Sequence, residues 1–417
     1  MNQIKIEGRH VLHGTIHISG AKNSAVALVP ASLLADEIVS IDNVPNISDI
    51  DALDEILTYL GANVSRDGNL MKIDPSNIVC REIPESISAK LRASYYFMSA
   101  MLGKFHHVEM YFPGGCAIGA RPIDQTLKAF KALGATVIEE GNKYIVDADR
   151  LIGAPIYLDM PSVGATINAI LVAAKAEGVT TIENCAKEPE IVSIATFLNN
   201  MGAKIRGAGT STITITGVEA LHGCFTEVIP DRIEAGTYMI AGALLGNQLK
   251  IANIIPEHVE SLTLKLKEMG YPIEIGDDYI IISSIEHPKA IAVKTLGYPG
   301  FPTDLQQPLT VLLTQSTGTS KLEETIYENR FGHVPYLNRM GSDILIKDRS
   351  MFVTGETKLV GKEVVATDLR AGAAMILAGL SAHGTTTINS IEHVLRGYEN
   401  ILEKLTSVGA KVDLIEI

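Results

Sequence analysis

The sequence predicts an α/β protein of two similar domains, each with helices inside and sheets outside. Three observations lead to this prediction: the length of the chain, a glycine motif that recurs six times, and six helices rich in small apolar residues. The chain has 417 residues, which is too long for one ordinary hydrophobic core. Because 46% of the residues are hydrophobic and 20% are charged, with no low-complexity stretch, we expect an ordered globular protein.

The glycine motif consists of an apolar helix, a Leu, Met or Val, a glycine and a short strand. Its glycines are Gly61, Gly134, Gly202, Gly270, Gly341 and Gly409, at intervals of 68 to 73 residues. Repetition at so even a spacing indicates a repeated structural unit. Each glycine is predicted to cap the end of its helix, where a positive φ turns the chain into the strand.

The helices rich in small apolar residues follow the same period, and each precedes a predicted strand. The helices cover 24–34, 93–102, 165–175, 235–245, 307–313 and 371–380, and the strands 38–41, 107–111, 180–183, 248–252, 321–325 and 385–390. Helices that are apolar on nearly every face must be buried on nearly every face. The six units divide into two sets of three near residues 228–230, and we expect the ligand in the cleft between the domains.

The starts of these helices carry residues suited to anions. A helix N-terminus offers unpaired N–H groups and the positive end of the dipole, and a cation adds to this preference. Arg92 and Arg370 stand at helix starts against the dipole and are interpreted as anion-binding residues. Arg232 follows Asp231 directly, which also allows a structural pair. Asp, Ser and Thr at such positions are equally consistent with ordinary caps.

A glycine-rich loop over 113–122 contains Cys116, with Arg121 five residues further on. A nearby cation stabilises a thiolate, so Cys116 is predicted to titrate near neutral pH and to donate a proton or attack carbon. The other cysteines, Cys80, Cys185 and Cys224, have no such surroundings and are interpreted as buried, inert thiols. No Cys-x-x-Cys pair occurs, which argues against zinc and against a disulfide framework.

Charge and composition exclude several classes of function. The net charge of −13 argues against a general nucleic-acid binder. The N-terminus lacks the apolar core of a signal peptide, and no apolar run is long enough to span a membrane. The eleven histidines show no metal-ligand spacing. We therefore expect a cytoplasmic protein with no metal and no cofactor, whose oligomeric state the sequence leaves open.

Four further residues carry weak signals by themselves. Asp304, in a turn-rich approach to a helix, is either a general base for a hydroxyl or an N-cap. Arg330 lies in a polar turn, and Arg396 stands just before the last helix. His333 is either catalytic or structural.

Taken together, these segments resemble the UDP-N-acetylglucosamine 1-carboxyvinyltransferases, the enolpyruvyl transferases that open bacterial peptidoglycan synthesis. The resemblance covers essentially the whole chain and rests on 20–24, 113–122, 162–166, 230–234, 302–304, 328–331, 368–370 and 396–398. It implies two inside-out α/β domains, each of three βαβαββ-type units around buried helices. One domain would span 22–229 and carry the Cys116 loop; the other would join 1–21 to 230–417, with the active site in the interdomain cleft.

The resemblance also implies the reaction, which transfers the enolpyruvyl group of phosphoenolpyruvate to the 3′-hydroxyl of UDP-N-acetylglucosamine. Phosphate leaves after addition and elimination through a tetrahedral ketal. Cys116 matches the proton donor, which the epoxide fosfomycin alkylates, and Asp304 matches the general base; Lys22, Asn23 and Arg396 complete the catalytic set. The residues that match phosphoenolpyruvate contacts are Lys22, Asn23, Arg121, Arg330, Arg370 and Arg396. Those that match UDP-N-acetylglucosamine contacts are Arg92, Arg121, Pro122, Ile123, Asp124, Gln125, Ser162, Val163, Gly164, Asp304 and Ile326.

Three alternatives stay open at this point. The nearest is the shikimate-pathway enolpyruvyl transferase, which shares the architecture but lacks the cysteine loop. A repeat-built RNA-end-modifying protein is disfavoured by the negative charge. A regulatory paralogue that only binds a UDP-sugar is disfavoured by the intact set Lys22, Cys116, Asp304 and Arg396. Leu395, where an acidic residue is common, leaves open whether the chain is a main enzyme or a second copy.

Overall fold

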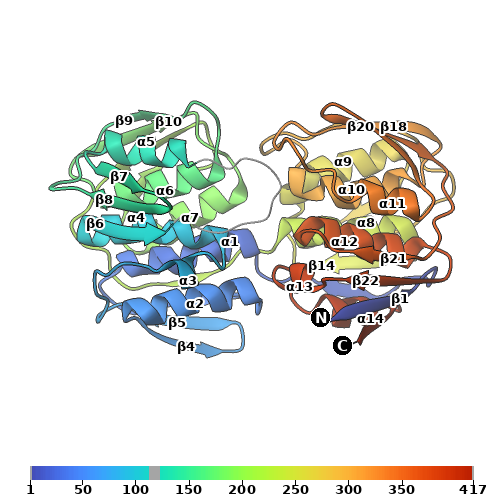
Figure 1. Cartoon of the computed structure of the whole chain (residues 1–417), viewed down its shortest axis with the longest axis horizontal. Helices are drawn as coiled ribbons and strands as arrows, with labels where there is room; N and C mark the ends of the chain where they lie inside the picture. The colour runs from blue at the N-terminus through green and yellow to red at the C-terminus, as the bar shows by residue number, and fades with distance from the viewer. Residues whose placement is uncertain (1, 112–122, 416–417) are drawn as a thin grey trace. The chain divides into compact units, whose positions relative to one another are not determined.

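The structure of the chain, a computed structural model, describes residues 2–111 and 123–415. The described residues divide into two compact units (Figure 1). One contains residues 20–111 and 123–229, and the other contains residues 2–19 and 230–415. Each unit encloses a hydrophobic core of its own. The predicted α/β class and two-domain architecture are confirmed.

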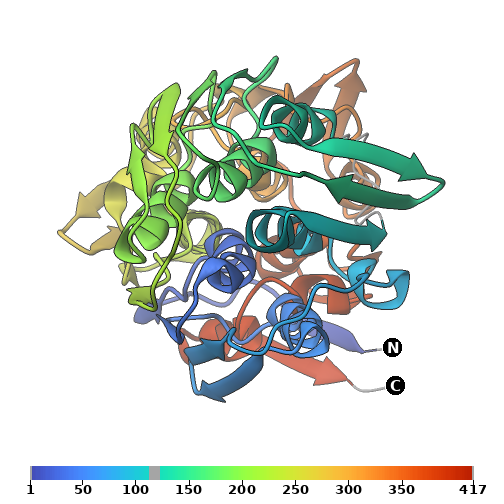
Figure 2. The same ribbon diagram turned by 90° about the vertical axis from the view of Figure 1, so that its left-hand side faces the viewer.

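The unit of residues 20–229 has helices inside and strands around them (Figure 2). Its small-residue helices are α1 (Lys22–Ala31), α4 (Tyr96–Phe105) and α6 (Val163–Ala173). Every residue of α6 from Ala165 to Ala173 is buried, as its apolar sequence predicts. The helices that end at the repeated glycines are α2 (Ser48–Leu60), α5 (Asp124–Ala132) and α7 (Pro189–Asn200). Short elements are η1 (Ser32–Leu34), α3 (Glu85–Ser88) and η2 (Arg92–Tyr95).

Three sheets belong to this unit. The first has the order β13 (Phe225–Glu227), β3 (Val39–Asp42), β5 (Leu70–Asp74) and β4 (Asn63–Asp67). The second has the order β11 (Lys204–Arg206), β12 (Thr212–Thr216), β10 (Val179–Glu183) and β9 (Pro155–Tyr157). The third has the order β6 (His107–Tyr111), β8 (Lys143–Asp147) and β7 (Thr136–Glu140). Alternate residues of β12 are buried, which is the pattern of a sheet with one face on the core.

The unit of residues 2–19 and 230–415 repeats this plan. Its small-residue helices α8 (Arg232–Leu245), α10 (Gln306–Leu313) and α12 (Leu369–Ser381) pack against one another. The helices before the repeated glycines are α9 (Glu260–Met269), α11 (Val334–Arg339) and α14 (Ile401–Ser407). Short elements are η3 (Pro256–Val259), η4 (Thr303–Leu305) and α13 (Glu392–Leu395), the last of which the sequence did not predict.

Three sheets surround these helices. The first has the order β21 (Glu363–Val365), β22 (Thr385–Asn389), β1 (Gln3–Glu7) and β23 (Lys411–Ile415). The second has the order β15 (Ile273–Ile275), β16 (Tyr279–Ile282), β14 (Leu249–Ala252) and β2 (Thr15–His17). The third has the order β17 (Ala292–Lys294), β18 (Gly318–Glu323), β20 (Ser350–Gly355) and β19 (Asp343–Lys347).

All six sheets share one pattern of pairing, which is the structural form of the sequence repeat. In five of them a short edge strand pairs in parallel with the strand that follows a small-residue helix. In the sheet of β6, β7 and β8, a single parallel bridge between Ile83 and Met110 takes that place. The six glycines of the repeat all have a positive φ, between 99° and 107°, as predicted for helix caps.

Two edge strands pair within one unit although the chain continues from them into a helix of the other unit. Strand β2 leads into α1 but pairs with β14 of its own unit. Strand β13 leads into α8 but pairs with β3. The chain therefore passes from one unit to the other after each of these strands, and the N-terminal residues belong with the C-terminal half.

Among the described helices, none combines the length and the apolar character that crossing a membrane requires.

Candidate functional site

Three helix starts in the unit of residues 230–415 carry an aspartate, and one of them behaves differently. Asp231 caps α8 by accepting hydrogen bonds from two backbone N–H groups, and Asp368 caps α12 in the same way. Asp304, on η4 before α10, makes no side-chain cap. The N-cap interpretation of Asp304 is therefore wrong, because its carboxylate is engaged by two arginines instead.

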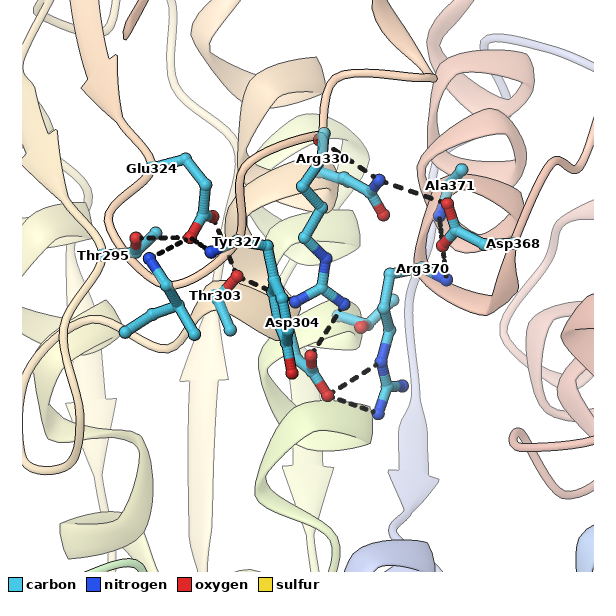
Figure 3. A network of polar contacts seen from close by, with 12 residues as sticks. Thr295, Thr303, Asp304, Glu324, Tyr327, Arg330, Asp368, Arg370 and Ala371 are labelled. Carbon is cyan, nitrogen blue, oxygen red and sulfur yellow. Dashed lines mark hydrogen bonds and ion pairs between the residues drawn. The ribbon is translucent and has the colours of Figure 1, made fainter. Parts of the chain in front are cut away.

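Those two arginines reach Asp304 from separate segments (Figure 3). Arg330 Nη2 lies 2.8 Å from Asp304 Oδ1, and Arg370 approaches Oδ2 with Nη2 at 3.1 Å and Nε at 3.3 Å. Both arginine side chains are 4% exposed, whereas the Asp304 side chain is 26% exposed. The cluster thus presents two buried guanidinium groups behind one partly accessible carboxylate.

The electrostatics of this cluster favour the ionised forms. Burial raises the pKa of Asp304, but the charges of Arg370 and Arg330 outweigh it and hold the pKa well below its usual range. Burial lowers the pKa of Arg370, but Tyr398 and Asp304 more than compensate and raise the pKa above its usual value. Two such guanidinium groups are suited to bind a carboxylate or phosphate through paired hydrogen bonds.

Aromatic rings support the arginines of this unit. The Arg370 guanidinium lies 5.3 Å from the centre of the Tyr398 ring, and that of Arg330 lies 5.1 Å from the centre of the Tyr327 ring. Arg232 lies 5.7 Å from the ring of Tyr298. A cation over an aromatic face is held without the loss of its hydrogen-bond donors.

The sequence did not single out Glu324, which lies fully buried beside this cluster. Its carboxylate accepts hydrogen bonds from Thr295, Thr303 and two backbone N–H groups (Figure 3). Thr303 in turn accepts a hydrogen bond from Arg330 at 2.8 Å. No local signal marks this glutamate, because it stands at the end of an ordinary strand pattern.

His333 fits the structural interpretation. Its side chain is fully buried, and burial lowers its pKa to about 3. Neither ring nitrogen has a hydrogen-bond partner among the described residues. A histidine that stays neutral and buried is poorly suited to transfer protons near neutral pH.

In the other unit, Lys22 and Asn23 form the first turn of α1. Lys22 Nζ lies 2.9 Å from Oδ2 of Asp49, a buried residue of α2. Arg92 is half-buried in η2, and α4 itself begins only at Tyr96, so Arg92 opens a 3₁₀ turn rather than the helix. Each unit therefore holds a predicted phosphoenolpyruvate-binding cation against a carboxylate of its own.

The residues predicted to contact the UDP-sugar in this unit lie at two helix starts. Ser162 caps α6 by accepting from the Ala165 N–H, and Val163 and Gly164 form the first turn. A Cβ atom at Gly164 would lie 1.6 Å from Tyr95 Oη, so a larger residue would require the Tyr95 side chain to move.

At the start of α5, Gln125 is buried and Ile123 precedes the helix, while Asp124 is exposed. Gln125 donates to Asp159 and accepts from its backbone N–H. This double contact ties the start of α5 to the segment after β9.

Two predicted site residues of the other unit lie on short elements. Arg396, half-buried, caps the C-terminal end of α13. Ile326 is 40% exposed, although its backbone N–H is bound by the buried Glu324.

Cys116, Arg121 and Pro122 lie outside the described residues, so their predicted roles stay predictions. Of the other cysteines, Cys185 is buried and Cys224 is half-buried, and burial raises the pKa of each to about 11. Cys80 is exposed, which corrects the expectation of a buried thiol, although partial desolvation still raises its pKa. Within residues 2–111 and 123–415, no group of three or more acidic, His or Cys side chains could hold a metal ion.

Known proteins with similar sequences identify the family. The family model of EPSP synthase (3-phosphoshikimate 1-carboxyvinyltransferase) matches residues 6–405. The UDP-N-acetylglucosamine 1-carboxyvinyltransferase 2 of Geobacillus kaustophilus is 54% identical over 412 residues, which cover 99% of this chain and 96% of the relative. The protein of the same name from Bacillus subtilis is 53% identical over 413 residues, with the same coverage. This chain belongs to the UDP-N-acetylglucosamine 1-carboxyvinyltransferase family.

Solved structures agree with this membership. The enolpyruvyl transferase NikO from Streptomyces tendae has a TM-score of 0.90 at 27% identity, covering 99% of this chain and 98% of its own. EPSP synthase from Acinetobacter baumannii has a TM-score of 0.76 at 17% identity over the full length of both chains, which shows a common fold. The chain is thus an enolpyruvyl transferase of peptidoglycan synthesis, and the expected family is confirmed.

Proposed function

We propose that this enzyme transfers the enolpyruvyl group of phosphoenolpyruvate to the 3′-hydroxyl of UDP-N-acetylglucosamine and releases phosphate. The observation that carries the choice of substrates within this fold is the 54% identity over 99% of the chain to a relative named for that sugar nucleotide. The EPSP synthase of Acinetobacter baumannii, by contrast, is only 17% identical. We place the reaction in the cytoplasm, where peptidoglycan precursors are made.

The reaction has two stages. In the addition, the 3′-hydroxyl oxygen bonds to C2 of phosphoenolpyruvate while the methylene carbon C3 gains a proton, which gives the tetrahedral ketal. In the elimination, the C2–O bond to phosphate breaks and C3 returns a proton. In our assignment Cys116 donates the proton to C3, and Asp304 takes the proton of the hydroxyl.

The carboxylate of phosphoenolpyruvate is assigned to Arg330 and Arg370, with Arg396 beside them. The paired geometry at Asp304 supports this assignment, because two buried guanidinium groups already hold one carboxylate there. A bound substrate carboxylate would take over these donors and release Asp304. With its two cationic partners engaged elsewhere, the pKa of Asp304 would rise toward its ordinary range, so that it becomes a base only once phosphoenolpyruvate is bound.

The phosphate of phosphoenolpyruvate is assigned to Lys22, Arg121 and Arg396, with Asn23 beside the reacting centre. Lys22 begins α1, where the helix dipole also favours a phosphate. The UDP-sugar is assigned to the helix starts and turns that carry the following residues: Arg92, Arg121, Pro122, Ile123, Asp124, Gln125, Ser162, Val163, Gly164, Asp304 and Ile326.

Phosphate release tests the proposal directly. Folded enzyme is incubated with phosphoenolpyruvate and UDP-N-acetylglucosamine, and release is compared with either substrate alone and with shikimate 3-phosphate as acceptor. We expect release only with the UDP-sugar, and loss of release in Cys116→Ser and Asp304→Ala. Release with shikimate 3-phosphate, or none with both proposed substrates, would overturn it.

A further inference from the structure

We propose that Glu324, which takes no part in the reaction itself, is a positioning residue that orients Arg330 and the turn at Ile326. The inference rests on the proposed function, because Arg330 is assigned there to the substrate carboxylate and Ile326 to the UDP-sugar. It adds a residue to which the proposed function assigns no substrate contact.

The two oxygens of the Glu324 carboxylate accept hydrogen bonds from different groups. Oε2 accepts a hydrogen bond from Thr303 Oγ1 at 2.8 Å. Oε1 accepts from Thr295 Oγ1 at 2.9 Å and from the backbone N–H groups of Ile326 at 2.8 Å and Tyr327 at 3.2 Å. One oxygen therefore faces the arginine cluster and the other fixes the turn of residues 325–327 (Figure 3).

The direction of the hydrogen bonds explains why an ionised acid is needed. A carboxylate only accepts, so the hydroxyl proton of Thr303 must point at Glu324. The lone pairs of Thr303 Oγ1 are then available to Arg330 Nη1, which donates at 2.8 Å. Because arginine only donates, this order cannot be reversed.

Arg330 is consequently held on two sides through Glu324. Thr303 fixes Nη1, which leaves Nη2 to point at Asp304 at 2.8 Å. The ring of Tyr327, whose backbone N–H donates to Glu324, lies 5.1 Å from the guanidinium group. Both the hydrogen-bonded edge and the stacked face of Arg330 therefore depend on the same carboxylate.

Burial argues against a purely structural role. Glu324 is fully buried, and no Lys, Arg or His side chain of the described residues forms an ion pair with it. Burying a carboxylate without an ion-pair partner is costly, and a glutamine of the same shape would avoid that cost. A carboxylate oxygen can only accept, so it makes the Thr303 hydroxyl a donor toward residue 324. A glutamine, whose amide can also donate, does not fix this direction.

The decisive variant is Glu324→Gln. To keep Oε1 on the two backbone N–H groups, the new amide must turn its NH₂ toward Thr303, so Thr303 Oγ1 accepts from the amide and its own proton loses the carboxylate that held it away from Arg330. We expect the KM for phosphoenolpyruvate to rise tenfold or more while kcat changes less than threefold. Thr303→Val should give a similar rise, the double variant no larger one, and Thr303→Ser, which keeps the hydroxyl, should stay within threefold of the wild type.

Thr295→Val is the matched control. It removes a buried threonine hydroxyl from the oxygen of the same carboxylate that does not face Arg330, and it also takes away the acceptor of the Thr325 backbone N–H. It should lower stability about as much as Glu324→Gln yet leave the KM for phosphoenolpyruvate within twofold. Equal rises in KM for Glu324→Gln and Thr295→Val, or additive effects of Glu324→Gln and Thr303→Val, would overturn the proposal.

A crystal structure of Glu324→Gln separates this inference from the proposed function. We expect the distance between Arg330 Nη1 and Thr303 Oγ1 to exceed 3.5 Å, whichever substrates the enzyme accepts. An unchanged Arg330 would overturn the positioning role even if the proposed reaction proceeds. A displaced Arg330 in a protein that releases no phosphate would support the positioning role and count against the proposed reaction alone.

Discussion

Asp304 and Arg370 are joined by two contacts, from Asp304 Oδ2 to Arg370 Nη2 at 3.1 Å and to Nε at 3.3 Å. Because Arg330 holds the other oxygen, one carboxylate balances two buried cations. A buried cation that loses its counter-ion destabilises the folded state. Asp304 therefore stabilises the ligand-free enzyme, and under the proposed function it competes with the substrate carboxylate for the same donors.

Replacing Asp304 by asparagine should lower the free energy of unfolding at pH 7 by on the order of 3 kcal/mol, because both arginines lose their counter-ion. The lowered pKa of Asp304 sets the pH dependence: its stabilisation is present above about pH 4 and is lost as the pH falls further. Urea unfolding of wild type and Asp304→Asn between pH 3 and 7 should show a difference that is constant above pH 5 and shrinks below pH 4.

The exposed Asp277 provides the control, and Asp277→Asn should change stability by less than about 0.5 kcal/mol. Phosphoenolpyruvate should raise the Tm of Asp304→Asn more than that of the wild type, since it supplies the missing anion. An equal rise in both proteins would contradict the competition between Asp304 and the substrate.

His333 should make the enzyme less stable in mild acid. Burial holds its pKa at about 3, whereas the unfolded chain takes up this proton near pH 6.5. Its contribution is therefore complete above pH 6.5 and falls by about 1.4 kcal/mol per pH unit as the pH drops toward 3. Between pH 6 and 4.5 the wild type should lose roughly 2 kcal/mol relative to His333→Gln. If the stabilities of the wild type and His333→Gln fell in parallel as the pH is lowered, that would contradict a buried neutral ring.

Thiol labelling should distinguish Cys116 from the other cysteines. A thiol with a pKa of about 11, as for Cys185 and Cys224, is ionised to roughly one part in 3,000 at pH 7.5. Mass spectrometry after fosfomycin treatment should show one adduct, on Cys116, which forms faster with UDP-N-acetylglucosamine and is absent in Cys116→Ser. Adducts spread over Cys80, Cys185 and Cys224 would argue against an activated Cys116.

Substituting a repeated glycine by a residue with a side chain should destabilise the protein, because the positive φ at these positions is strained for other residues. Gly270 has a φ of 104°, and an added Cβ would meet only Ile285 Cδ1, at 3.6 Å. Gly270→Ala should therefore lose about 1–2 kcal/mol from backbone strain alone. Gly270→Asn should lose less, because asparagine tolerates a positive φ. Equal stability of Gly270→Ala and the wild type in urea would contradict this reading of the repeat.

The sequence predicted the repeat and the buried helices well, because both depend on patterns of residues that are close together in the chain. Each of the six glycines marks a helix end by itself, and the apolar faces of α6 or α12 are evident without knowledge of their neighbours. The pairing of β2 with β14 and of β13 with β3 was not evident from the residues alone. Two short strands have similar sequences, and tertiary structure decides which strand each of them pairs with.

The site was predicted in part. Asp304 and Arg370 stood out at helix starts, but their ion pair spans 66 positions and neither residue reveals its partner. Glu324 escaped notice because its role depends on Thr303, 21 positions earlier, and on the backbone of the next turn. Residues that act by orienting others carry no signature of their own.

The position of β1 and β2 has a consequence for the order of assembly during synthesis. Residues 20–229 contain all strands of their three sheets, so that unit can close as soon as it leaves the ribosome. The first nineteen residues emerge before it but pair with β14, β22 and β23, the last of which ends at Ile415. Strand β1 must therefore remain unpaired until β22 and β23 have been translated, and during that interval both of its edges lack their partner strands.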